Sequence, residues 1–369
     1  MKKLFLAFTA LLALGLLAAC GEAEDTYLTS NPYETVDWNE QTPVLSNLHV
    51  HTDESDCASG LPHDVVDFYH EKGYGALAIT DHDLVTYPWT FSDLSDDYED
   101  RDPEALDMLD IVGNEFTVTS GDGYHDIVGL FTDYIPDHEE TEQETFENVT
   151  ADEEDALMIF VHPGRYWEIW EDYEPGDRFS VEWYMDFYET YDVDVLPGIE
   201  VFNRNNQYQY DVDLWDQLLT ESMPERPIWG FANDDFHGES DDRMHRSYIH
   251  VMMEDPSSKE EFRERLIEGA FYASNSNPDD TSPLLAGVEV DETERTITLS
   301  VDGEYTGIEW YSGYDEETGS GQQVGEGETF EYAAFEGDYV RARIYREAFG
   351  RHAETLTQPF GFIEDPDRD

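Results

Sequence analysis

The chain has 369 residues, enough for one large domain and a smaller one, and its 39% of hydrophobic residues can fill a sizeable core. Its 87 Asp and Glu residues far outnumber its 19 Lys and Arg residues, which gives a formal net charge of −68. A field of this sign excludes stable binding of duplex nucleic acid and disfavours anionic membrane surfaces.

Acidic residues occur along the whole chain, whereas lysine occurs only at Lys2, Lys3, Lys72 and Lys259. This composition resembles that of proteins from halophiles. We therefore expect most acidic side chains to lie on a solvated surface, where high salt screens their mutual repulsion.

The N-terminal residues are typical of an export signal. The Lys2-Lys3 pair precedes an apolar run over residues 4–17, which is short for a membrane span. The tetrapeptide that ends at Cys20 resembles a lipobox, so residues 1–20 are predicted to be a lipoprotein signal peptide, with an ordinary secretory signal as the alternative. The protein would be exported and lipid-anchored through Cys20, at the cell surface or on the periplasmic side of a membrane. Residues 21–43 are predicted to form a polar tether.

Residues 44–283 alternate strand-like and helix-like segments, a pattern typical of an α/β barrel. Apolar segments predict strands at 44–50, 76–80, 110–114, 126–131, 157–161, 195–201, 227–232 and 247–252. The stretch 165–194 is rich in Trp and Tyr, and we expect it to pack as a lid or subdomain, although it could also line a substrate cleft. From 284 to 369, short alternating strands separated by turns predict a small β-sandwich.

Two histidines follow the first predicted strand as His49-x-His51. Side chains of a strand repeat every two residues, so both imidazoles point to the same side and can bind one metal ion. Alone, this pattern fits two half-exposed strand histidines equally well.

The same association of strand and polar residue recurs along the chain. The further residues beside apolar segments are His82 (within Asp81-His82-Asp83), Glu115, His125, His162, Asp235 and His237. In barrels of alternating strands and helices, active sites occupy the rim at the carboxyl ends of the strands. Packing gives no reason for such residues to gather at one rim, so the pattern predicts a metal site.

These motifs together resemble those of the polymerase and histidinol phosphatase (PHP) superfamily over residues 44–277. The matching segments are Leu48-His49-Val50-His51-Thr52-x-x-Ser55-Asp56, Ile79-Thr80-Asp81-His82-Asp83, Gly113-Asn114-Glu115, His162-Pro163 and Asp235-x-His237. The resemblance implies a distorted (β/α)7 barrel of PHP type, followed here by the small C-terminal β-sandwich. It also implies a centre of two or three divalent metal ions.

Within this family pattern, three groups of ligands are implied. The first metal would be held by His49, His51, Glu115 and Asp235, and the second by the bridging Glu115 with His125 and His162. The third would be held by Asp56, His82 and His237. Mixed histidine and carboxylate ligands suit Mn, Zn or Fe without choosing among them. Cys57 stands where the family usually has glycine, which puts the loop of Asp56 in question.

The resemblance further implies hydrolysis of phosphomono- or diesters by a metal-bridging hydroxide. Besides the bridging Glu115, we expect Asp235 to accept the proton of the attacking water and Arg165 to clamp the phosphate, although Arg165 could equally pair with a nearby acid. Glu200 is expected to support the site or contact substrate. The substrate would be a small phosphorylated molecule, with a nucleotide or oligonucleotide included.

Two other functions remain open at this point. The same kind of metal site serves amidohydrolase-like hydrolysis of C–N or C–O bonds, and fold analogy cannot separate the two chemistries. The third possibility is a metal- or ligand-binding lipoprotein without catalysis. Neither the natural substrate nor the identity of the metal follows from the sequence.

Overall fold

The computed structural model describes residues 26–364, apart from 121–122, 138, 169–177, 239–243, 277–280 and 349–350. The predicted signal peptide with Cys20 lies outside the described residues. Within the described residues, none of the helices is both long and apolar enough to cross a membrane.

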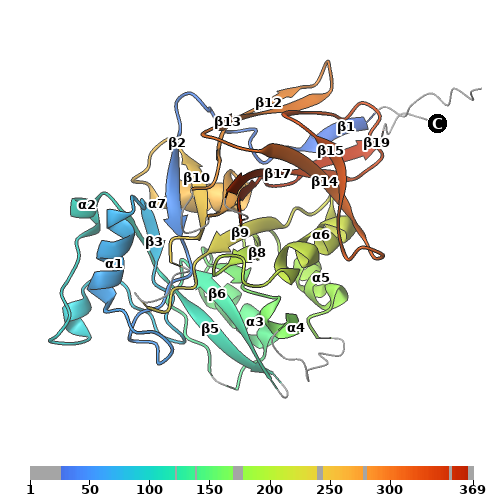
Figure 1. Cartoon of the computed structure of the whole chain (residues 1–369). Helices are drawn as coiled ribbons and strands as arrows, with labels where there is room; N and C mark the ends of the chain where they lie inside the picture. Colours follow the sequence, from blue (N-terminus) through green and yellow to red (C-terminus); the bar gives the residue numbers. More distant parts are fainter. Residues whose placement is uncertain are drawn as a thin grey trace, which may run out of the picture.

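The described chain is a mixture of many strands and fewer helices (Figure 1). The helices are α1 (Pro62–Glu71), η1 (Phe91–Asp93), α2 (Pro103–Leu106), α3 (Glu142–Asp152), α4 (Arg165–Glu168), α5 (Val181–Thr190), α6 (Tyr210–Ser222) and α7 (Lys259–Glu268). The strands are β1 (Thr26–Ser30), β2 (Thr42–Asn47), β3 (Ala76–Ala78), β4 (Leu109–Ile111), β5 (Gly113–Ser120), β6 (Gly123–Leu130), β7 (Leu157–Phe160), β8 (Gly198–Asn203), β9 (Trp229–Asn233), β10 (Ser247–Met253), β11 (Phe271–Asn275), β12 (Leu284–Asp291), β13 (Thr296–Asp302), β14 (Gly307–Asp315), β15 (Ser320–Glu326), β16 (Thr329–Glu331), β17 (Tyr339–Ala348), β18 (Arg351–Leu356) and β19 (Phe360–Glu364).

The strands of the predicted barrel form two sheets, and a closed (β/α)7 barrel is not shown. One sheet has the order β5-β6-β7-β8-β9, and β4, β3, β2, β10 and β11 belong to a larger second sheet. Isolated parallel bridges, Val50 to Phe236 and His82 to Glu115, join the two sheets. The strand directions are mixed, because β10 runs antiparallel to β2 and β6 runs antiparallel to both β5 and β7.

A large apolar core lies where the sheets meet the helices. It contains Phe146 of α3, Phe160 of β7 and, from α5, Tyr184, Phe187 and Tyr188. The ring centroids of Phe146 and Phe187 are 5.1 Å apart, and those of Phe160 and Tyr184 are 5.0 Å apart. The described part of the aromatic-rich stretch therefore packs into this core, as expected, through α5.

The C-terminal strands enclose a second apolar core and also extend the large sheet. The three-stranded sheet β12-β13-β16 contributes Ile297 and Phe330 to this core, and β14 and β19 contribute Trp310 and Phe362. The two sheets around this core resemble the sandwich expected from the sequence. However, β18 pairs with β11, so one sheet runs from this region to β11, β10 and β2.

Residues 26–43 are part of the fold, contrary to the polar tether expected there. Strand β1 pairs antiparallel with β19, near the other end of the described chain. Tyr33 is buried, and its hydroxyl donates a hydrogen bond to the carbonyl oxygen of Phe271 at 3.1 Å. Apolar residues such as Leu28, Val36 and Trp38 pack against the second core. The burial of these side chains stabilises the segment in the fold, although most of its residues are polar.

Candidate metal centre

Six imidazole or carboxylate side chains gather where the two sheets meet. His49 and His51 follow β2, His82 follows β3, Glu115 lies in β5, and His162 and Asp235 follow β7 and β9. Five of these side chains are at least 96% buried, and that of His82 is 29% exposed. The sequence motifs therefore do converge on one place in the fold.

The carboxylate of Glu115 lies at the centre of this group. Its Oε1 atom is 3.3 Å from His49 Nε2 and 3.1 Å from His162 Nε2. Its Oε2 atom is 3.0 Å from His51 Nε2 and 3.3 Å from His82 Nδ1. One buried carboxylate therefore faces four imidazoles, as expected for a ligand shared between two cations.

Asp235 is a second carboxylate that contacts His49 and His51. Its Oδ1 atom lies 3.5 Å from His49 Nε2, 3.2 Å from His51 Nε2 and 3.3 Å from His237 Nδ1. The Nε2 atoms of His49 and His51 are 3.3 Å apart, a separation that suits two ligands of one ion.

Ligand atoms within 4.8 Å of one another form several sets that could hold an ion. The sets made of histidines and acids are His49/Glu115/His162, His49/His51/Asp235 and His82/Glu115/Asp126. Buried nitrogen and carboxylate donors of this kind fit a transition-metal ion such as Mn, Fe or Zn. His237 is within reach of Asp235 but is not part of these sets.

The side chains of the site have strongly shifted pKa values. Burial alone would lower the pKa of His49 and His51, but the nearby carboxylates raise it, well above its ordinary value for His49 and to about 9 for His51. Burial would raise the pKa of Glu115 and Asp235, but neighbouring histidines, and Arg204 beside Asp235, hold both well below the ordinary range. Without a metal, protons thus supply the positive charge that the carboxylates require.

Glu200 contacts His49 and His162 and thereby orients them, in keeping with the supporting role expected for it. His49 Nδ1 and Glu200 Oε1 are 3.0 Å apart, which leaves the Nε2 atom of His49 facing Glu115. The other oxygen, Oε2, accepts hydrogen bonds from the His162 amide and the Asn203 side chain, each at 2.9 Å. Carboxylates in this position fix both the tautomer and the direction of a histidine ligand.

Asp81 and Asp83, which flank His82 in the sequence, form hydrogen bonds with its surroundings. Asp81 accepts hydrogen bonds from the amide and hydroxyl of Thr52 and from the hydroxyl of Ser55, at 2.7 to 2.8 Å. It thereby fixes the loop after His51. Asp83 accepts a hydrogen bond from the Thr117 amide, and the Thr117 hydroxyl lies 2.9 Å from His82 Nδ1.

His125 is not brought to the centre, and Asp126 is. In the β5–β6 pair, Asp126 is opposite Thr117 and Val128 is opposite Glu115, so Asp126 shares the face of Glu115. His125 points to the other face, where its ring lies 4.8 to 5.4 Å from those of Phe160, Phe179 and other aromatic residues. Burial first, and Arg178 next, lower its pKa well below the ordinary value.

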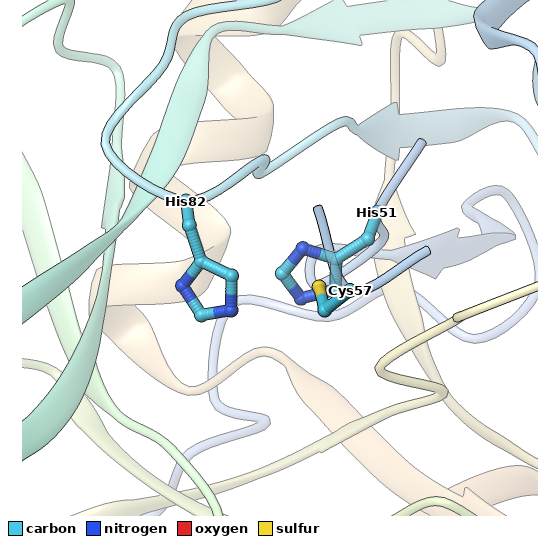
Figure 2. Close-up of side chains that lie close together, drawn as sticks. All are labelled: His51, Cys57 and His82. Carbon is cyan, nitrogen blue, oxygen red and sulfur yellow. The ribbon is translucent and has the colours of Figure 1, made fainter. Parts of the chain in front are cut away.

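The exposed Asp56 is also outside the donor sets, whereas its neighbour Cys57, which is exposed as well, belongs to one. The sulfur of Cys57 and nitrogens of His51 and His82 form a further set within 4.8 Å (Figure 2). The glycine-to-cysteine departure from the family pattern therefore falls beside the metal centre.

Two arginines flank the carboxylates of the centre. Arg165 Nη1 lies 3.2 Å from Asp126 Oδ2, so the ion pair considered as the alternative to a phosphate clamp is present. Arg204, which the sequence analysis missed, lies with its Nε atom 3.0 Å from Asp235 Oδ2. Its position directly after β8, at the same rim, was the available signal.

Several non-glycine residues of the centre have left-handed backbone conformations. The φ angles are 33° at His162, 46° at Asp235 and 48° at Arg204. Such conformations cost of order 1–3 kcal/mol each and cluster at functional sites, where the surrounding structure holds them. Their occurrence at three rim positions supports a site built for function.

No protein-family model matches the chain, and no curated protein matches it in sequence. An amidohydrolase from Chromobacterium violaceum, solved with bound sulfate and no metal, is 15% identical and gives a TM-score of 0.38 over 53% of this chain and 88% of its own. A protein from Bifidobacterium adolescentis, described as a candidate metal-dependent phosphoesterase, is 14% identical and gives a TM-score of 0.38 over 60% of this chain and 96% of its own. Likenesses this weak carry no argument about function, so the function must be argued from the donor atoms themselves.

Proposed function

We propose that this protein is a metal-dependent hydrolase and that its substrates are phosphoesters. The observation that carries the proposal is the buried carboxylate of Glu115, which lies within 3.3 Å of nitrogens from four histidines while Asp235 faces two of the same histidines. A packed core would not collect so many ionisable groups without a ligand, because each is costly to bury.

The residues suggest two principal positions for divalent ions. His49, His51 and Asp235 would hold one ion, and His162 with the other face of Glu115 would hold the second. When bound, such ions activate water and neutralise phosphoryl oxygens. Asp126, with His82, adds a carboxylate on the side of Glu115 where sequence reasoning had placed His125.

The side chains around the proposed ions would have different roles. The depressed pKa of Asp235 keeps it anionic, which suits a ligand and makes it a poor proton acceptor. Its proposed role as the base is therefore weaker than its role as a ligand. Glu200 and Asp81 hold the histidine-bearing loops, so the donor atoms are in place before substrate binds.

Positive charge beside the centre favours an anionic substrate. Arg165 and Arg204 flank the donor atoms, with side chains 28% and 16% exposed. The chain has only 19 Lys and Arg residues in all, so two of them at one rim support phosphate recognition over a neutral amide or lactone. A nucleotide or oligonucleotide as substrate, and lipid-anchored export, remain proposals from the sequence.

The proposal is tested with full-length protein stripped of metal, reloaded separately with Mn, Zn or Co, and assayed in high salt. We expect turnover of a chromogenic phosphomonoester or phosphodiester that depends on added metal. His51→Ala and Glu115→Ala should each lower kcat/KM by about 100-fold or more and reduce bound metal, since even supporting residues of metal sites contribute about 10–100-fold. His352→Ala is the matched control, because His352 is 46% exposed on β18.

Amide and lactone substrates are assayed in parallel. Turnover of these alone would replace the phosphoester proposal with the amidohydrolase-like alternative. Tight metal binding without turnover of any substrate would favour the non-catalytic binding protein. Full activity in His51→Ala would contradict the assigned centre.

A further inference from the structure

Cys57 lies at the solvent-facing edge of the candidate metal centre. Figure 2 shows its sulfur close to the rings of His51 and His82, which come from the segments that follow β2 and β3. Ligand atoms of the three side chains all lie within 4.8 Å of one another. His51 belongs also to the set with His49 and Asp235, so the two positions are neighbours.

The surroundings orient His82 toward this edge. Its Nδ1 atom is 2.9 Å from the Thr117 hydroxyl and 3.3 Å from Glu115 Oε2. Its other ring nitrogen, Nε2, faces the side on which His51 and Cys57 lie (Figure 2). The Ser55 hydroxyl also holds the backbone amide of His82 at 3.0 Å, so the two loops that carry the donors are tied together.

The spacing is close to what one ion requires. Zinc binds thiolate sulfur at about 2.3 Å and imidazole nitrogen at about 2.0–2.1 Å, so two such ligand atoms lie about 3.3–3.6 Å apart in a tetrahedral site. Donor atoms that lie up to 4.8 Å apart must therefore approach one another by up to about 1.5 Å. The exposed side chain of Cys57 has the freedom to do so.

We propose that Cys57 and His82, with water completing the coordination, form a third metal position beside the ion that His51 would hold, and that this position is selective for a thiophilic ion of the zinc class. The proposal rests on the proposed metal centre and deepens it. On binding, the S–H bond breaks, a sulfur–metal bond forms, and the proton passes to water. No electron is transferred, so no oxidant or reductant is required.

A thiolate changes which ions the centre prefers. Carboxylates and waters suit Mn and Mg, imidazole suits several transition metals, and thiolate favours Zn and other soft ions. The remaining donors of the centre are imidazoles and carboxylates, which do not discriminate strongly. Cys57 is therefore the residue that would favour Zn, Co or Cd over Mn at the outer position.

The test uses cobalt as a spectroscopic probe of the full-length protein in high salt. Thiolate ligation of Co(II) produces an intense near-ultraviolet charge-transfer band, which imidazole and carboxylate ligands do not give. We expect this band in the wild-type protein and its loss in Cys57→Ser. Cys20→Ser is the matched control, since Cys20 and Cys57 are the only cysteines of the sequence, and it should retain the band.

Metal preference supplies a second readout that does not depend on the band. In competition between Zn and Mn, Cys57→Asp should shift the outer position toward Mn by about tenfold or more. Cobalt bound without a thiolate band, and an unchanged Zn/Mn ratio in Cys57→Asp, would overturn this proposal and leave the main centre standing. A protein that binds no cobalt at all would overturn both.

Discussion

At the scale of single residues, substitutions of the neighbours His125 and Asp126 should have opposite effects on metal binding. Asp126 shares the face of Glu115, whereas both ring nitrogens of the buried His125 lack a hydrogen-bond partner among the described residues. Asp126→Asn should weaken metal binding by about 10–100-fold, as measured by equilibrium dialysis with elemental analysis. His125→Phe should keep the metal content of the wild-type protein. Loss of metal in His125→Phe alone would reverse the assignment.

Proton release upon metal binding is a second expectation at this scale. The pKa of His49 is raised well above its ordinary value and that of His51 is raised to about 9, so both are protonated in the metal-free protein at neutral pH. Metal binding should therefore release protons at pH 7, and the apparent affinity should increase up to about pH 9. Calorimetric titration in buffers of different ionisation enthalpy counts these protons, and a count of zero would contradict the charge states.

The same two histidines affect the stability of the metal-free protein. A histidine whose pKa is raised by folding contributes stability fully below its unfolded pKa of about 6.5, and this contribution is lost as the pH rises through the folded pKa. The free energy of unfolding should therefore decrease between about pH 6.5 and about pH 9 when the metal is absent. Bound metal should remove most of this dependence, because it replaces the protons.

The sequence predicted most of the centre but not its exact positions. His49, His51, Glu115, His162 and Asp235 lie together as the motifs implied. At His125 and Asp56, the donor sets contain the next residue along the chain instead, Asp126 and Cys57 respectively. A shift of one residue in a strand reverses the face to which a side chain points. Apolar patterns alone do not fix a register that closely.

At the scale of elements, the pairing of β8 with β9 positions Glu200 behind His49. Gly198 is opposite Trp229 in this pair, and a Cβ atom at Gly198 would lie 1.9 Å from the Trp229 carbonyl oxygen. Gly198→Ala should therefore separate the strands and lower the free energy of unfolding by about 1–3 kcal/mol or more. Denaturant unfolding, followed by a measurement of metal affinity, checks both effects.

Gly287→Ala is a milder comparison for this experiment. Its added Cβ would meet Ser300 Cβ at 3.3 Å, on an outer strand far from the donor atoms in the sequence. If Gly198→Ala were no less stable than Gly287→Ala, the close approach of β8 and β9 would not be as tight as described.

The alternation of strands and helices predicted the existence of the elements better than their directions. The predicted strand at 157–161 corresponds to β7 and that at 247–252 to β10. Yet β6 and β10 run antiparallel to neighbours that the barrel would require to be parallel. Direction depends on how the connecting segments cross the sheet, and a short hairpin such as that between β5 and β6 imposes the antiparallel arrangement.

At the scale of the whole molecule, net charge dominates the response to salt. With a formal net charge of −68, self-repulsion disfavours the compact state, and the Debye length falls from about 10 Å at 0.1 M to about 3 Å at 1 M salt. We expect the Tm to increase markedly between 0.1 M and 1 M KCl, as measured by calorimetry. A Tm that does not change with salt would contradict the prediction of a halophilic surface.

The two halves of the chain were predicted as separate domains, but pairing between distant strands is not visible in local patterns. The β11–β18 pair joins residues 79 to 83 positions apart, and β1–β19 joins the two ends of the described chain. Neither pairing is marked in the sequence by a connecting turn or by a motif. The apolar residues of 26–43 were overlooked because the surrounding sequence is polar.

The β11–β18 pair also affects how the protein can be shortened. A fragment ending near residue 283 would lose β18 and leave Ala273, Ser274 and Asn275 of β11 without their partner strand. Open strand edges of this kind invite pairing with other molecules. Shortened forms intended to isolate the half with the candidate metal centre should therefore self-associate, and they would be poor substitutes for the intact chain in assays or crystallisation.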